Sequence, residues 1–271
     1  MSDMTQPEFS ESTFAFAVAG TALEISAIHR EGDKAPIVFL HGFGSTKEDY
    51  ADIVRHAEFD GHPFVAYDAP GCGETRCANL AKIDIAFLVE TALAVLERVR
   101  FERFHLVGHS MGGLTALMLA HRCRERVLSF VDIEGNIAPE DCFLSRQIAD
   151  YPRENAERFF SDFIERTRHA PAYASALYAA SLRHKVRAEA VGPIFRSMVA
   201  LSDHGDLMDK FLGLPFPRMF MYGEQNASLS YLDAIGEQGV VLAEIANCGH
   251  FPMYSNPVAM WQSIAALQRG I

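Results

Sequence analysis

Largely apolar runs without polar alternation recur along the 271-residue chain, and segments with helical spacing separate them. This alternation constrains the fold more than any other feature, because a strand that is apolar on both sides must be covered on both faces. The runs occupy residues 36–42, 63–68, 104–110, 127–134, 218–223 and 240–245. Strands that alternate with helices form mainly parallel sheets, so the sequence predicts an α/β fold.

Two β-patterned stretches precede these runs, and helical segments can be placed between the strands. Residues 13–19 and 22–29 are joined across Gly20 and Thr21, which predicts an antiparallel hairpin. Apolar residues recur at helical spacing in the segments 46–58, 82–99, 111–122, 229–236 and 255–268. We therefore expect a mostly parallel, eight-stranded sheet flanked by helices.

The alternation is interrupted over residues 138–212, which are helix-prone and rich in Ala, Arg and Phe. Prolines that are expected to break its helices are Pro152, Pro171 and Pro193. We interpret this segment as a helical cap inserted between the sixth and seventh strands. Residues 1–137 and 213–271 would then form one core domain around the sheet.

The chain is acidic, with 24 Lys and Arg residues against 35 Asp and Glu residues and a net charge of −11. Such a charge repels phosphate backbones and anionic membrane surfaces, so no nucleic acid or membrane partner is expected. The five cysteines are scattered and form no CxxC pair, which favours a reduced, intracellular protein. We predict a soluble, cytoplasmic monomer or homodimer whose partner is a small-molecule substrate.

The stretch VGHSMGG, residues 107–113, places one serine between glycines where an apolar run meets a helical segment. A strand that turns sharply into a helix needs small residues beside the strained turn, and Gly108 and Gly112 are small. Ser110 would then project from the turn as a nucleophile. The amide of Met111, at the start of the helix, would point into the same site as an oxyanion donor.

A second oxyanion donor is expected from the loop LHGFGS, residues 40–45, which directly follows another apolar strand. The amide of Phe43 is the donor that we select in this loop. If these two amides bind an oxyanion, Phe43 and Met111 also border the substrate. His109, next to the nucleophile, is expected to line the substrate site with them.

A serine hydroxyl is a poor nucleophile until a base takes its proton. Among the 11 histidines, His250 follows the last strand and precedes the last helix, in the stretch NCGHFPMYSNP. Its loop would return to the carboxyl edge of the sheet, where Ser110 is expected. His250 is therefore the predicted catalytic base.

Together these residues resemble the α/β-hydrolase superfamily over nearly the whole chain. The motifs that carry the resemblance are HGFGS at 41–45, DAPGCGET at 68–75, GHSMGG at 108–113 and NCGHFP at 247–252. The resemblance implies an α/β-hydrolase fold and an activity such as those of esterases, lactonases or carbon–carbon bond hydrolases. Epoxide hydrolases and haloalkane dehalogenases use an aspartate nucleophile, so the serine at the elbow argues against both.

The third member of a triad is the point of departure from this superfamily. Most members carry an acidic residue after the seventh strand, in a Gly-x-x-Asp pattern that here ends in Asn226. We favour Glu134 as the acid, because it stands at the end of the sixth strand, beside the elbow. Asp132 lies deeper on the same strand, and a shifted loop would bring in Glu224. These three alternatives remain open.

The expected activity is that of a serine hydrolase with a Ser110, His250 and Glu134 triad, acting on a small to medium ester, thioester or lactone. No metal ion or organic cofactor is required for this chemistry. The cap stretches CFLSRQIADYP and RFFSDFIERT suggest an apolar pocket with one or two anion-binding points. Two alternatives are a cofactor-free dioxygenase, in which the serine is not a nucleophile, and a ligand-binding receptor or regulator of the same fold.

Overall fold

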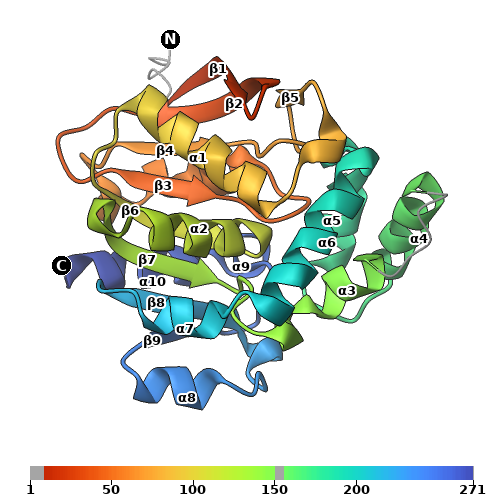
Figure 1. Cartoon of the computed structure of the whole chain (residues 1–271). Coiled ribbons are helices and arrows are strands. Elements are labelled where there is room, and N and C mark those ends of the chain that lie inside the picture. The colour runs from red at the N-terminus through yellow and green to blue at the C-terminus, as the bar shows by residue number, and fades with distance from the viewer. Residues whose placement is uncertain (1–8, 150–155, 271) are drawn as a thin grey trace, which may run out of the picture.

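One sheet forms the centre of the fold in the computed structural model, which describes residues 9–149 and 156–270 (Figure 1). Its strand order is β1-β2-β4-β3-β6-β7-β8-β9, with the short strand β5 beside β2. The strands are β1 (Ser10–Val18), β2 (Thr21–Arg30), β3 (Ile37–Leu40), β4 (Phe64–Tyr67), β5 (Arg76–Cys77), β6 (Phe104–His109), β7 (Val127–Ile133), β8 (Arg218–Gly223) and β9 (Val241–Ile245).

The pairing of the strands matches the predicted fold class. β1 and β2 form the antiparallel hairpin, and β2 pairs antiparallel with β4. From β4 through β3, β6, β7 and β8 to β9, every neighbouring pair is parallel. The described part of the chain adds β5 to the eight expected strands. Two residues carry no period, so the sequence pattern could not predict this strand.

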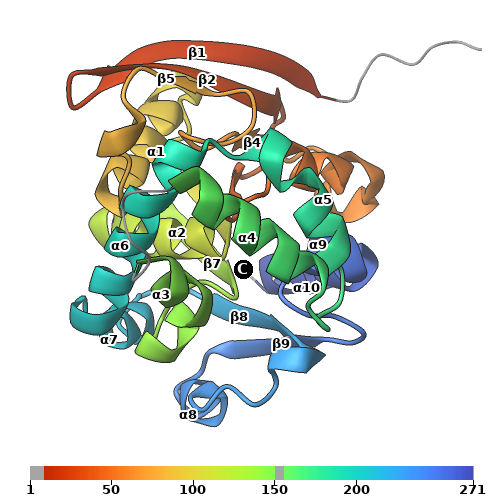
Figure 2. The same cartoon turned by 90° about the vertical axis from the view of Figure 1, so that its right-hand side faces the viewer.

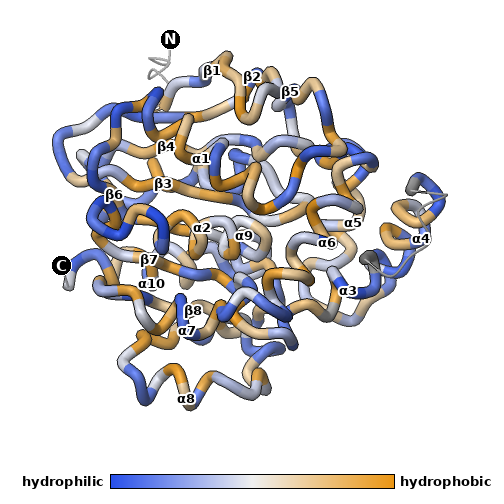
Figure 3. Tube along the Cα trace, viewed as in Figure 1, coloured by the Kyte–Doolittle hydropathy of each residue, from blue (hydrophilic) through white to orange (hydrophobic). Residues whose placement is uncertain are grey.

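Helices cover both faces of the sheet. α1 (Ile85–Val99) and α2 (Met111–Arg122) lie on one face, and α10 (Pro257–Arg269) lies on the other (Figures 1 and 2). α9 (Pro252–Ser255) precedes α10, and α8 (Leu232–Glu237) lies beside β9 at the edge of the sheet. In Figure 3, β3 is hydrophobic along its whole length, as expected for a strand covered on both faces.

The segment predicted as a helix over 46–58 forms 3₁₀ helices at Lys47–Arg55 and Ala57–Phe59 instead of an α-helix. In the first of them the buried residues are Lys47, Tyr50 and Ile53, at a spacing of three. This spacing is the period of a 3₁₀ helix, in which side chains three apart lie on one face. The α-helical period assumed for this segment was therefore wrong.

Five α-helices lie between β7 and β8 in the described residues: α3 (Phe143–Ala149), α4 (Ala156–Arg168), α5 (Ser175–Lys185), α6 (Ala188–His204) and α7 (Leu207–Leu212). Figure 2 shows α3, α4, α5 and α6 in front of the sheet, at the end where the parallel strands finish. The insertion therefore occurs where the sequence predicts it, between the sixth and seventh of the expected strands. We call α3 to α6 the cap.

The helix breaks predicted at the three prolines of this insertion are confirmed only in part. α6 runs through Pro193, so the expected break there is wrong, whereas Pro171 does separate α4 from α5 and Pro152 lies outside the described residues. α7 packs against α2, and Phe211 meets Phe130 of β7 with ring centroids 6.0 Å apart. The domain boundaries at 137/138 and 212/213 stay predictions.

Across residues 9–149 and 156–270, no helix combines the length and the apolar character that crossing a membrane would require.

Candidate active site

The turn between β6 and α2 has the geometry predicted for a nucleophile elbow. Ser110 lies between strand and helix with φ 53° and ψ −118°, a backbone conformation that residues other than glycine rarely adopt. A Cβ atom added to Gly108 would lie 2.5 Å from the carbonyl oxygen of Gly112, and one added to Gly112 would lie 2.2 Å from that of Leu40. Both positions therefore require glycine, as the sequence predicts.

Ser110 opens into a cavity of about 360 Å³ that is lined by residues of the sheet domain and of the cap. The cavity receives side chains from the loops that follow the strands and from α3, α4, α5 and α6. Its lining residues are Phe43, Ser110, Glu134, Asn136, Glu140, Asp141, Leu144, Ser145, Phe163, Thr167, Ala170, Ala172, Tyr173, Ser175, Tyr178, Phe195, Met198, Phe220, Asn226, Leu229, Tyr231, His250 and Phe251. Aromatic and aliphatic side chains form the larger part of this lining, and polar and acidic side chains form the rest.

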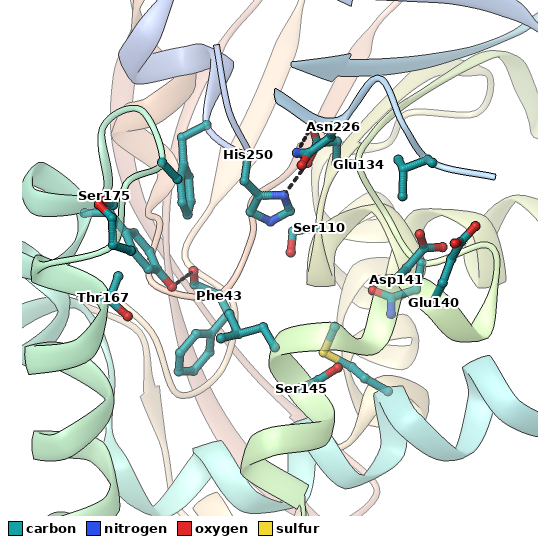
Figure 4. A pocket seen from close by; sticks show the side chains of 18 of the residues that line it. Phe43, Ser110, Glu134, Glu140, Asp141, Ser145, Thr167, Ser175, Asn226 and His250 are labelled. Carbon is teal, nitrogen blue, oxygen red and sulfur yellow. Dashed lines mark hydrogen bonds and ion pairs between the residues drawn. The ribbon is translucent and has the colours of Figure 1, made fainter. Parts of the chain in front are cut away.

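The carboxylate of Glu134 meets the imidazole of His250 in this cavity, with 2.6 Å between Oε2 and Nδ1. Glu134 directly follows β7, and its backbone has a positive φ of 47°. Figure 4 shows Ser110 beside the imidazole, with Glu134 and Asn226 on the other side of the ring. The structure thus brings together all three residues that the sequence analysis selected for the triad.

Asn226 holds this carboxylate from the end of the 3₁₀ helix Glu224–Asn226, which follows β8. Its side-chain nitrogen donates to both oxygens of Glu134, at 2.9 and 2.8 Å, and the amide of Gly223 donates to Oε1 at 2.8 Å. In the sequence, Asn226 occupies the position of the usual acid, and no role was predicted for it. That position could have indicated its role, because an amide there can donate to a neighbouring carboxylate.

Asp132 is not placed to serve His250. Its side chain is fully buried, and Oδ1 accepts a hydrogen bond from the amide of Gly135 at 2.8 Å. Burial raises the pKa of the Asp132 carboxyl well above its ordinary value, which favours the neutral acid. A Cβ atom at Gly113 would lie 2.4 Å from Oδ1, so this carboxyl is packed under the start of α2. In the described chain, the carboxylate bonded to His250 is that of Glu134.

The two expected oxyanion donors belong to the loop after β3, which approaches Ser110, and to the residue that follows Ser110. Phe43 lies on the loop after β3, and its carbonyl oxygen accepts a hydrogen bond from the phenol of Tyr178, in α5, at 2.9 Å. Met111 begins α2, where the first amides of a helix have no acceptor within the helix. The side chain of Met111 is buried, and Met111 is not among the described residues that line the cavity, so the expectation that its side chain borders the substrate is wrong. The donor roles of both amides stay predictions.

The prediction that His109 contacts substrate is wrong. Its side chain is fully buried, and Nε2 lies 2.8 Å from the carbonyl oxygen of His250, to which it donates. Within the described chain the cavity lining does not include it. Burial lowers the pKa of the His109 imidazole well below its ordinary value, so the ring is neutral. His109 therefore supports the loop that carries His250.

The anion-binding points expected from the cap arginines are absent from the described cavity lining. Arg146 pairs with Asp203, at 2.5 and 2.8 Å, and Arg166 donates to the side chain of Gln147. Arg158 is exposed on α4. The phenylalanines of the same stretches divide between two roles: Phe159 and Phe160 are buried in the cap, whereas Phe163 is buried and also lines the cavity. The side chain of Phe143 lies outside the described residues.

Groups of three or more His, Cys, Asp or Glu side chains that could hold a metal ion do not occur in the described part of the chain.

Comparison with known proteins places this geometry in a family. The model of the alpha/beta hydrolase family matches residues 37–262, which include the elbow, the loop of Phe43 and His250. The chain belongs to that family. As an alpha/beta hydrolase it carries a serine at the elbow and its triad acid candidate directly after β7, the strand before the cap.

The relatives of this alpha/beta hydrolase have different names. A Mycoplasma pneumoniae protein whose name assigns it to the esterase/lipase class is 23% identical over 235 residues, which cover 81% of this chain and 84% of that protein. A 2-succinyl-6-hydroxy-2,4-cyclohexadiene-1-carboxylate synthase of Salmonella paratyphi C is 25% identical over 243 residues, or 86% of this chain and 93% of the synthase. A solved thermophilic esterase from Thermogutta terrifontis has a TM-score of 0.74 at 19% identity and covers 96% of this chain and 98% of its own, a likeness in fold.

Proposed function

We propose that this alpha/beta hydrolase cleaves small to medium carboxylic esters, thioesters or lactones by acyl transfer through Ser110. The observation that carries the proposal is the 2.6 Å contact between Glu134 and the Nδ1 atom of His250, with Ser110 beside the same imidazole in one cavity. A nucleophile, a base and a group that orients the base are the parts that acyl transfer needs.

In the proposed cycle, Nε2 of His250 accepts the proton of Ser110 while the serine oxygen attacks the carbonyl carbon of the substrate. The amides of Phe43 and Met111 stabilise the oxyanion that forms. His250 then donates the proton to the departing alcohol or thiol, which leaves an acyl-enzyme. Water attacks this ester with His250 again as the base, and the carboxylic acid departs with Ser110 restored.

Glu134 has two roles in this cycle. It accepts a hydrogen bond from Nδ1 of His250, which keeps the other ring nitrogen free to act as the base. Its negative charge stabilises the imidazolium that forms when the proton leaves Ser110. The donors from Asn226 and Gly223 occupy the remaining lone pairs of the carboxylate and fix its orientation.

The relatives support the ester class without deciding the substrate. The Mycoplasma protein is named for the esterase/lipase class, and the Thermogutta structure is that of an esterase. The Salmonella relative is named as a synthase, which illustrates that one fold hosts several reactions. The site itself therefore carries the argument for ester hydrolysis.

A fluorophosphonate probe tests the proposal, because it modifies serines that are activated as nucleophiles. We expect wild type to be labelled on the peptide that contains Ser110, as identified by mass spectrometry, and to hydrolyse p-nitrophenyl butyrate. Ser110→Ala should lose the label and lower kcat by at least about 10³-fold. Ser145→Ala is the matched control, because this serine also lines the cavity and is not part of the triad.

Labelling of folded wild type at another residue, or full turnover by Ser110→Ala, would overturn the nucleophile assignment. In that case oxygen uptake with hydroxylated aromatics and ligand retention without turnover would test the dioxygenase and receptor alternatives.

A further inference from the structure

Carboxylates line the cavity that holds Ser110, and its described lining includes no Lys or Arg. Glu134, Glu140 and Asp141 contribute carboxyl groups, and of the lining residues that the structure describes none is Lys or Arg. His250 is the one lining side chain in this set that can carry a positive charge. The chain as a whole has a net charge of −11, which adds a field of the same sign.

Asp141 and Glu140 are fixed in place rather than free to turn away. Both lie in the 3₁₀ helix Pro139–Cys142, at the start of the insertion. Oδ2 of Asp141 accepts from the amides of Ile137 and Ala138 at 2.8 and 2.7 Å, and Oδ1 accepts from the phenol of Tyr231 at 2.7 Å. Figure 4 shows Asp141 and Glu140 together on one side of the cavity, with Ser110 between them and Thr167.

Glu140 is held by a second pair of bonds. Its Oε1 atom accepts from the hydroxyl of Ser230 at 2.6 Å and from the backbone amide of the same residue at 3.2 Å. These donors are neutral, so they orient the carboxylates without cancelling their charge. Arg146 of α3 forms an ion pair with Asp203 of α6.

We propose that the cavity selects acyl compounds without an anionic group, and that Glu140 and Asp141 determine this specificity. An anionic substrate would lose its hydration on entering the cavity, and the carboxylates there would repel it. No described Lys or Arg in the lining would pair with its charge, so its binding would cost free energy. A neutral ester of the same shape avoids this cost. The kinetic test of this selection rests on the proposed function. The selection also predicts that neutral esters bind more tightly than anionic ones, whether or not they are hydrolysed.

The inference separates this chain from one of its relatives. The Salmonella synthase is named for a product that carries a carboxylate. A cavity that excludes anions does not suit such a compound, so this chain is not expected to share that reaction.

Two pairs of esters test the charge selection, since either the acyl group or the leaving group could face Asp141. The first pair is the mono-p-nitrophenyl ester of suberic acid and the same ester of suberamic acid, in which a neutral amide replaces the carboxylate. The second pair is the butyrate ester of 4-hydroxybenzoic acid and that of 4-hydroxybenzamide. We expect kcat/KM of wild type to be at least about tenfold lower for the anion in one pair or both.

The double variant Glu140→Gln, Asp141→Asn should reduce this discrimination to less than about threefold by raising kcat/KM for the anion. The matched control is Glu97→Gln, Glu237→Gln, which removes the same charge from exposed sites on α1 and α8 and should leave the ratio unchanged. Thermal denaturation of each variant shows whether it is folded, and Glu140→Gln alone gives a second test if the double variant is not.

Binding of the same esters to Ser110→Ala, measured by calorimetry, tests the selection without turnover. If wild type hydrolyses no ester while Ser110→Ala still binds neutral members more tightly, the proposed function fails and the charge selection stands. Equal affinity and equal kcat/KM within both pairs would overturn the charge selection. Discrimination that persists in the double variant would overturn the assignment to Glu140 and Asp141.

Discussion

The side-chain amide of Asn226 donates to both carboxylate oxygens of Glu134, which in turn contacts His250. Most superfamily members carry an acid where this chain has Asn226. The two positions are thus in direct contact beside His250, and the carboxylate stands on one and its donor on the other.

This arrangement predicts that the carboxylate that contacts His250 can be moved from position 134 to position 226. Glu134→Gln should lower kcat by about 10²- to 10⁴-fold, because the imidazolium loses its counter-charge. Adding Asn226→Asp should recover at least about tenfold of that loss, since a carboxylate returns to the site. Adding Gln225→Glu, which introduces the same charge one residue away, should recover nothing. Turnover of p-nitrophenyl butyrate decides the matter, and equal rates for both double variants would contradict the prediction.

Tyr178 is predicted to orient the oxyanion loop from within the cap. Its phenol donates to the carbonyl of Phe43, and its ring lies 4.3 Å from that of Phe251, next to His250. Tyr178→Phe removes one hydrogen bond and should lower kcat by about fivefold to tenfold, with little change in KM. Tyr222→Phe, which removes a phenol outside the cavity, is the control. A change in KM alone would show that Tyr178 only contacts substrate.

His109 is predicted to stabilise the loop of His250 rather than to bind substrate. His109→Phe leaves the carbonyl of His250 without its donor in the protein interior around the His109 ring, which should lower the free energy of unfolding by about 1–3 kcal/mol and reduce kcat. His109→Gln keeps a donor and should lose less of both. Chemical denaturation and ester turnover measure the two effects, and unchanged stability of His109→Phe would refute the role.

The charge selection should depend on pH through Asp141. Burial raises the pKa of Asp141 from 3.8 to about 6, so its carboxyl is ionised above that pH and neutral below it. Titratable groups that face it are Glu140, Tyr231 and Asp132. Discrimination against the anionic ester should therefore weaken as the pH falls through about 6.

The ratio of the two kcat/KM values is the quantity to measure, because a change in the activity of the triad affects both esters equally and cancels. Asp141→Asn should reduce the pH dependence of this ratio to the part that comes from protonation of the ester's own carboxylate. A wild-type ratio that changes with pH no more than that of Asp141→Asn would contradict the assignment.

The parts of the fold that the sequence predicted are those with strong local signals. The apolar runs of β3, β6 and β7 carry the pattern of doubly covered strands, and the glycines beside Ser110 mark the elbow. His250 followed from its place after the last strand. In each case a few neighbouring residues determine the local structure, so no knowledge of distant contacts was needed.

The remaining errors concern side-chain direction and contacts between distant segments. The order of residues places His109 beside Ser110 but does not say that its ring turns inward to meet the carbonyl of His250. The cap arginines lie near pocket residues in sequence, yet Arg146 turns to Asp203, 57 positions away. The bond between Tyr178 and Phe43 spans 135 positions, and no periodicity reports such a pair.

That last bond has a consequence for engineering. Grafting another cap onto this core would exchange the wall of the cavity, but it would also remove the phenol that restrains the peptide after Phe43. A chimaera can therefore gain a new pocket and still turn over slowly, unless the donor cap supplies a hydroxyl at the position of Tyr178. The cap would therefore determine both which substrate fits the cavity and how fast it is turned over.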